Sequence, residues 1–454
     1  MKNKIDRNII PQSDKPNDVH FPEYNQIVSE KGSKIFIIND SRFPIITFRI
    51  IFKRGAILDR NDNIRTDGLS NFLADMLFKG TEDRKASEIS RIIDSFGASV
   101  SSGSDYDYNF ITFHCLKKYF RNMMELIYDI MQNSIFPEEE IERMKLQKIN
   151  TLYSLMDSGE YLASKKYKEI IYGSSPYSVC IEGTMDSIQK IDREKLFYAY
   201  NNFLLNAETS VCFIGDITSD EDLQLPELFG NENGNAEIDV PEMPSIDKTK
   251  IYIIERKSAV QSDIIMGNKT IRRNHPDYIP MKVMNTALGG YYTSRINTNL
   301  REVNGFTYGA KSQLNSRKYQ GDILVDTNVK NDLTGDAIRE IIKEIKRMQD
   351  ELMSEDELQS VKNYIIGTYP MQLETPNSIA SKILALDLYD IDEKFYNTYI
   401  SEINSITPQI VRQMAQKHLK PDNLVISVCG NTNDIIKSVE KALPDIEIIK
   451  QEKK

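Results

Sequence analysis

The feature that most constrains the fold of this chain is a weak internal repeat. Residues 34–56 have the pattern of two strands around a turn, and residues 250–270 show the same pattern about half a chain later. The two halves also close alike, because 210–218 and 424–432 are apolar strands that end in Gly and a turn residue. Long helical patterns lie between these strands. The repeat predicts two copies of one α+β unit, duplicated and fused.

The segment between the two copies is rich in Asp, Glu, Asn, Gly and Pro and has little periodicity. We interpret it as a linker; the alternative is a long surface loop within one domain. A chain of 454 residues also exceeds one ordinary core, which favours two domains. The predicted parts are an N-terminal extension (1–21), a first domain (22–218), a linker (219–248), a second domain (249–447) and a tail (448–454).

Composition excludes several classes of function. The net charge of −10 argues against a general nucleic-acid binder, which needs a cationic surface. The apolar runs have the length of strands and none approaches the roughly 20 residues that span a bilayer, so no membrane partner is expected. The N-terminus has no continuous apolar stretch of the kind found in secretory signals. We therefore expect a cytoplasmic protein, or a periplasmic or organellar one if the chain is a processed mature form.

The cysteines and histidines do not form a local metal site. The four cysteines contain no CxxC pair, and buried free thiols are the expected state. The four histidines contain no pair spaced four residues apart, so no two of them could bind a metal from one helical turn.

An amphipathic helix is predicted within residues 68–81. Its apolar face consists of Leu69, Phe72, Leu73, Met76 and Leu77. A second face carries Asn71, Ala74 and Asp75, at the spacing where a metallopeptidase helix would carry two imidazoles and a carboxylate. This face offers one amide, one methyl group and one carboxylate.

Several ordered motifs resemble the insulinase/pitrilysin family of zinc peptidases, whose smaller members include the mitochondrial processing peptidase subunits. In chain order they include RGAILDR, GLSNFLADMLFKGTEDR, SFGASVSSGSDYDY, PYSVCIEGT and REVNGFTYGA, and the resemblance extends from about residue 22 to about residue 442. It implies an α+β fold of two homologous mixed α/β-roll halves, each a mostly antiparallel sheet with helices packed on one face. Together these form one half of a metallopeptidase clamshell.

The resemblance implies that the zinc site is lost. Active members carry the inverted motif His-x-x-Glu-His, in which the histidines bind zinc and the glutamate is the general base. The matching positions here are Asn71, Ala74 and Asp75, which is a degenerate metal site. The third ligand of the family comes from a helix that begins near Pro137, and no acidic residue occurs between Glu142 and Asp157. We expect no metal in this chain, and we interpret Asn71 and Asp75 as part of a solvated helix face; the alternative is that Asp75 ligates a metal.

The resemblance also assigns substrate binding to Arg301 and Tyr308, since the second half of family members supplies an arginine and a tyrosine that face the zinc. Locally, Arg301 ends a helical pattern, Asn304 and Gly305 are expected to stop the helix in the left-handed conformation, and a strand follows. Both side chains can donate hydrogen bonds to a peptide carbonyl or oxyanion. The alternative is a surface arginine and a core tyrosine.

A candidate edge strand for substrate follows the predicted helices. In active relatives, the corresponding strand binds extended peptide by adding it to the sheet. The candidate residues are Gly97, Ala98, Ser99, Val100, Ser101 and Ser102. They could equally form a plain surface edge.

These features lead to one functional hypothesis and two rivals. The hypothesis is a non-catalytic, substrate-binding subunit of a heterodimeric zinc metalloendopeptidase that acts on peptides or unfolded segments, with zinc held by the homologous partner chain. This chain alone is then expected to be inactive and to carry no cofactor. The first rival is a structural or peptide-binding scaffold of the same fold without a proteolytic role. The second is a self-sufficient hydrolase with unusual ligands.

Overall fold

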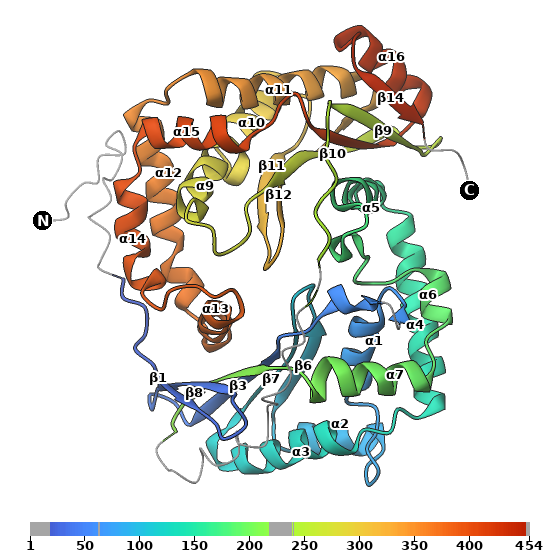
Figure 1. Ribbon diagram of the computed structural model, residues 1–454, viewed down its shortest axis with the longest axis vertical. Coiled ribbons are helices and arrows are strands. Elements are labelled where there is room, and N and C mark those ends of the chain that lie inside the picture. The colour runs from blue at the N-terminus through green and yellow to red at the C-terminus, as the bar shows by residue number, and fades with distance from the viewer. Residues whose placement is uncertain (1–18, 62–63, 218–237, 239, 451–454) are drawn as a thin grey trace, which may run out of the picture.

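The computed structural model describes residues 19–61, 64–217, 238 and 240–450. It contains two six-stranded sheets, one in each half of the chain, which Figure 1 shows in separate lobes. In spatial order, the first sheet consists of β1 (Asn25–Val28), β2 (Lys34–Asn39), β8 (Thr209–Gly215), β3 (Ile45–Phe52), β7 (Asn109–Leu116) and β6 (Ser99–Ser104). The second consists of β11 (Ala310–Ser316), β12 (Gly321–Lys330), β10 (Gln261–Thr270), β13 (Val425–Gly430), β9 (Lys250–Glu255) and β14 (Glu447–Lys450).

Helices surround the two sheets. Those of the first half are α1 (Leu69–Met76), α2 (Ala86–Ser95), α3 (Phe120–Asn133), α4 (Glu138–Met156), α5 (Gly159–Tyr172), α6 (Met185–Gln189) and α7 (Arg193–Ala199). Those of the second half are α9 (Tyr278–Asn285), α10 (Arg295–Asn297), α11 (Thr334–Asp350), α12 (Glu355–Thr368), α13 (Pro376–Leu388), α14 (Phe395–Ser405), α15 (Pro408–His418) and α16 (Thr432–Ala442). None of the helices that the structure describes is both long enough and apolar enough to cross a membrane.

The two sheets share one topology, which confirms the predicted α+β fold of two homologous halves. In the first sheet, β8 lies between β2 and β3, parallel to β2 and antiparallel to β3. In the second, β13 lies between β9 and β10 with the same orientations. The late strands β8 and β13 are therefore central in space. The sheets differ at one edge, where β1 is antiparallel to β2 and β14 is parallel to β9.

The central strands are buried, and most of their side chains are apolar. All seven residues of β8 are buried, and Phe48 of β3 stacks on Phe113 of β7 with ring centroids 4.9 Å apart. Burial of aromatic side chains of this size stabilises a core strongly. The four cysteines are free and buried, as predicted from their spacing.

Each half contributes one helix to the sheet of the other half. Helix α5 packs on β10 and β13, although it follows α4 in the first half, and α13 of the second half packs on β3 and β8 (Figure 1). Asp387 of α13 is buried and bonded to Lys34, Lys53 and Ser210 of the first half. The helical patterns in the sequence do not indicate this exchange.

The predicted domain boundaries fall partly outside the described residues. Residues 1–18 of the predicted extension, residue 218 at the end of the predicted first domain, most of the predicted linker (219–237 and 239) and residues 451–454 are not described. Within the predicted tail, 448–450 belong to β14. The boundaries stay predictions.

Candidate functional site

Helix α1 is held at its N-terminus by a buried carboxylate. Gly68 has φ +87° and lies so close to Gly183 that a Cβ would approach the Gly183 Cα to 2.6 Å, so only glycine fits this position. The Asp59 carboxylate accepts hydrogen bonds from Gly68 N at 2.9 Å, Ser70 N at 3.0 Å and Ser70 Oγ at 2.6 Å. Complete burial raises the pKa of Asp59 to about 7, against the effect of these donors. The motif RGAILDR thus supplies the cap of the helix that follows it.

The degenerate metal-site positions contact a lysine of α4. The Lys148 ammonium donates to Asn71 Oδ1 and forms an ion pair with Asp75 Oδ2. Ala74 lies between them and is 2% exposed. The Lys148 side chain is 16% exposed, so the three residues make a part-buried contact between α1 and α4. This face of α1 is therefore a part-buried helix interface, and the expectation of a solvated helix face is wrong because Lys148 of α4 covers it.

The residues at this position do not fit zinc. One carboxylate and one amide oxygen are too few protein ligands, and both already bind a cationic side chain. In the part of the chain that the structure describes, no three His, Cys, Asp or Glu side chains are grouped so that they could hold a metal ion. Ala74 also has no group that could accept a proton from water.

The candidate substrate strand forms an edge of the first sheet. Residues Ser99 to Ser102 lie in β6, whose one partner among the described strands is β7, and Gly97 and Ala98 precede it. Ser102 Oγ donates to the Ala74 carbonyl oxygen at 2.7 Å, so β6 is attached to α1. The outer edge of β6 presents backbone groups to which an extended peptide could pair.

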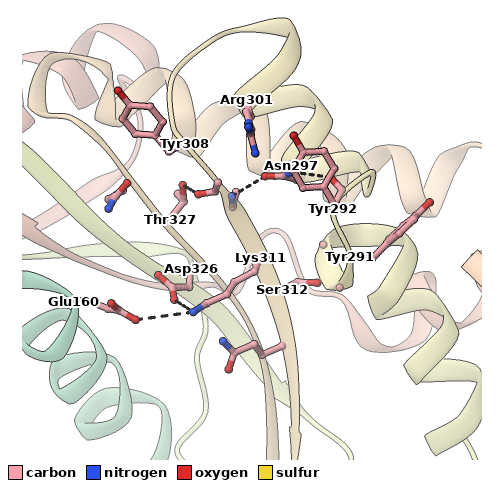
Figure 2. Close-up of a pocket in the computed structure, with 16 residues that line it drawn as sticks. Glu160, Tyr291, Tyr292, Asn297, Arg301, Tyr308, Lys311, Ser312, Asp326 and Thr327 are labelled. Carbon is pink, nitrogen blue, oxygen red and sulfur yellow. Dashed lines mark hydrogen bonds and ion pairs between the residues drawn. The ribbon is translucent and has the colours of Figure 1, made fainter. Parts of the chain in front are cut away.

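Arg301 and Tyr308 line one pocket of about 680 Å³ in the second half (Figure 2). The π-helical segment Thr298–Val303 carries Arg301, and Gly305 with φ +64° turns the chain toward β11. The expectation that Asn304 also adopts the left-handed conformation is wrong, since its φ is −99°. Its side chain instead donates to the Asn299 carbonyl oxygen at 2.9 Å and so closes the helical segment.

In the described part of the chain, Arg301 and Tyr308, the two predicted substrate residues, form no hydrogen bond or ring contact with each other. Arg301 Nε lies 3.3 Å from Glu302 Oε1, and its guanidinium lies 4.8 Å from the centre of the Tyr292 ring. Tyr308 is 88% exposed, and Figure 2 shows its hydroxyl pointing away from Arg301. Tyr308 is thus no core tyrosine, and both side chains can reach a molecule in the pocket.

The floor of the pocket is formed by β11, β12 and the first turn of α5. Asn297 accepts a hydrogen bond from Ala310 N at 2.9 Å and donates to the Tyr292 carbonyl oxygen at 2.6 Å, which fixes the start of β11. Lys311 pairs with Asp326 at 2.9 Å and lies 4.0 Å from Glu160 (Figure 2). The hydrogen bond with Asp326 raises the pKa of Lys311. The pocket therefore combines hydrogen-bond donors, exposed aromatic rings and a largely neutralised charge cluster.

Sequence reasoning missed several residues of these sites. Lys148, Tyr292, Asn297 and Lys311 were not predicted. Nothing in the sequence separates Lys148 from Lys145 on the same helix, because both lie within one charged pattern. Tyr292 and Asn297 precede Arg301 by nine and four residues, and this nearness in sequence was the available signal.

The fold and the sites define a peptidase-like chain of two homologous halves, whose helix α1 carries no metal-binding motif. Residues 34–178 match the family described as Insulinase (Peptidase family M16), and residues 190–365 match the Peptidase M16 inactive domain. The chain belongs to this family. Since α1 has neither the zinc ligands nor the general base of active members, the chain is a non-catalytic member.

Two of the relatives described next match nearly the whole chain, and a third matches 60% of it. This chain is 22% identical to the uncharacterized zinc protease YmxG of Bacillus subtilis, over 88% of this chain and 98% of that protein. It is 21% identical to the non-peptidase homolog YmxG of Helicobacter pylori, over 87% and 93%. It is 24% identical to the mitochondrial-processing peptidase subunit beta of Bos taurus, over 60% and 55%.

A solved structure confirms the fold. The crystal structure of a peptidase M16 inactive domain from Pseudomonas fluorescens aligns with a TM-score of 0.83 at 20% identity, over 90% of this chain and 98% of that one.

Proposed function

We propose that this chain is the non-catalytic, substrate-binding subunit of a heterodimeric zinc metalloendopeptidase. Its substrates would be peptides or unfolded segments, and a homologous partner chain would hold the zinc. The observation that carries the proposal is the pocket in which Arg301 and Tyr308 are both accessible, in a chain whose own α1 has no metal ligands. A chain that keeps peptide-binding groups without a metal can serve hydrolysis only beside the metal of another chain.

The chemistry of the pocket supports this role. The guanidinium and the phenol both donate hydrogen bonds, and a peptide carbonyl accepts more strongly as it becomes tetrahedral. The strand β11 borders the pocket as an edge of the second sheet, and β6 is an edge of the first. A bound peptide could therefore use backbone pairing for affinity and the Arg301 and Tyr308 side chains for orientation. The similarity to a subunit of a mitochondrial-processing peptidase favours a two-chain assembly.

The test starts with the purified chain. We expect it to bind no stoichiometric zinc and to cleave no quenched-fluorescence peptide. A homologue from the same organism with an intact His-x-x-Glu-His motif is then co-expressed with it. We expect a stable heterodimer in size-exclusion chromatography and a gain in peptide cleavage.

Two results would count against the proposal. Chelator-sensitive cleavage by the isolated chain would favour the self-sufficient hydrolase. Two separate monomers, with no gain in cleavage on mixing, would favour the scaffold.

A further inference from the structure

A lysine ammonium lies between the two helices that a zinc ion would join in an active relative. Lys148 of α4 contacts Asn71 and Asp75 of α1, the two positions that match the histidine ligands. α4 is also the helix from which the third ligand of the family would come. The positive charge of the site is thus supplied by the chain itself.

We propose that Lys148 is a built-in cation that replaces the metal: it clamps α4 to α1 and makes the site unable to accept a divalent ion. This inference does not depend on the proposed function, because it concerns only contacts within the chain.

The electrostatics of the three residues support the clamp. The Asp75 side chain is 38% exposed and that of Lys148 only 16%, so the lysine is the more desolvated partner and needs a nearby anion. The side-chain amide oxygen Oδ1 of Asn71 supplies a second acceptor for the same ammonium. A divalent cation at this place would meet the fixed charge of Lys148 within a few ångströms, and the repulsion would add to the shortage of ligands.

The contact between Lys148 and α1 is also linked to β6, the edge strand of the first sheet. Ser102 of β6 donates to the Ala74 carbonyl oxygen, and Ala74 lies between the two residues that Lys148 binds. Loss of Lys148 therefore removes a restraint on α1, and through α1 a restraint on β6. Lys148 is a positioning residue in this sense.

The first experiment compares Lys148→Met with Lys145→Met in the full chain. Lys145 is a matched control, because it lies on the same helix, its side chain is 15% exposed, and it pairs at 2.7 Å with Glu142, a residue of α4 itself. We expect Lys148→Met to lower Tm by about 2–4 °C and Lys145→Met to change it by less than about 1 °C. Hydrogen exchange of the β6 amides should speed up in the first variant only.

Two further results bear on the clamp. Lys148→Arg keeps a cation, so its Tm should lie closer to that of wild type than to that of Lys148→Met. This comparison shows whether the charge, and not only the packing of the aliphatic side chain, stabilises the contact. Equal Tm values and equal β6 exchange in the two methionine variants would overturn the clamp.

The second experiment tests metal exclusion. The variant N71H/A74E/D75H restores the inverted motif on α1, and it is prepared with Lys148 and with Lys148→Met. We expect zinc, titrated as the free ion in competition with a chelator, to bind about tenfold more tightly when Lys148 is absent. Circular dichroism establishes that both variants are folded. Equal zinc affinity with and without Lys148 would overturn the claim that this residue excludes the metal.

Discussion

Tyr172 of α5, in the first half of the chain, donates a hydrogen bond to Asp322 of β12, in the second half. Both residues are at most 1% exposed, and Arg317 also contacts the pair. At the other junction, Asp387 of the second half pairs with Lys34 and Lys53 of the first half. The two halves are thus held together by buried polar contacts on the helices that they exchange, and the pocket that contains Glu160 of α5 depends on this arrangement.

Tyr172→Phe should destabilise the chain. The substitution keeps the aromatic ring but removes a donor from the buried Asp322, which should cost about 1–3 kcal/mol of the free energy of unfolding. Urea denaturation followed by circular dichroism measures this loss. Tyr128→Phe is the control, because Tyr128 is 38% exposed and should change stability little. A loss no larger than that of the control would show that the Tyr172 hydroxyl contributes nothing to the junction.

Asp387→Ala should have a larger effect. It would leave the Lys53 ammonium, whose side chain is 8% exposed, with Glu208 as its remaining carboxylate partner. Removing one member of a buried pair typically costs about 3–5 kcal/mol, and the remaining pair with Glu208 places the expected loss at the lower end, about 3 kcal/mol. The exposed Glu393→Gln serves as control, measured by the same denaturation. Similar midpoints for the two variants would contradict the role of this ion pair in docking α13.

The Asp387 carboxylate also predicts that the stability of the chain depends on pH in the acid range. Burial raises the pKa of Asp387, but the charge of Lys53 and hydrogen bonds from Lys34, Lys53 and Ser210 outweigh burial and lower this pKa below its usual value. Its contribution is therefore fully present above the unfolded value of about 3.9 and is lost as the pH falls through the folded pKa. The stability difference between wild type and Asp387→Ala should shrink when measured below about pH 4. A difference that stays constant from pH 7 to pH 3 would disagree with this linkage.

Lys282 is expected to destabilise the chain at neutral pH and to stop doing so at alkaline pH. Burial, followed by repulsion from Lys382 and Arg273, lowers the pKa of Lys282 to about 8, and its ammonium lies 5.0 Å from the centre of the Tyr399 ring. The cost of holding the charge is fully present below pH 8 and is relieved as the pH rises toward 10.4, the unfolded value. Lys282→Met should raise stability at pH 7 by about 1–2 kcal/mol, and the gain should disappear near pH 10. Lys441 is exposed, so Lys441→Met should show no such gain. Denaturation midpoints of both variants at pH 7 and pH 10 test this prediction.

Arg301→Ala and Tyr308→Phe test the proposed function in the assembled heterodimer. If these groups stabilise the tetrahedral carbonyl, each loss should lower kcat by about 10²–10³ with a smaller change in KM. Lys346→Ala, at an exposed position on α11, is the control. Size-exclusion chromatography must show that every variant still forms the heterodimer. Wild-type rates in both variants would favour the scaffold.

Local pattern was sufficient to predict much of the fold. Apolar strands such as 34–39 and 424–430 must be buried wherever they lie, and their repetition predicted two homologous halves. The edge position of β6 agrees with its small and polar residues. At α1, the identities of Asn71, Ala74 and Asp75 were enough to exclude a hydrolytic zinc site, because ligand chemistry depends on residue type.

Which distant side chains contact each other could be learned only from the tertiary structure. Lys148 lies 77 residues from Asn71 in the chain, and it differs from Lys145 only in the direction that α4 gives it. In the same way, α5 and α13 carry ordinary helical patterns that do not specify which sheet they cover. The sequence by itself determined which segments are buried and which chemistry is missing, since both follow from local residue types. The tertiary structure alone decided which distant side chains meet, because a part-buried charge is stabilised by whichever opposite group the packing of the helices brings within reach.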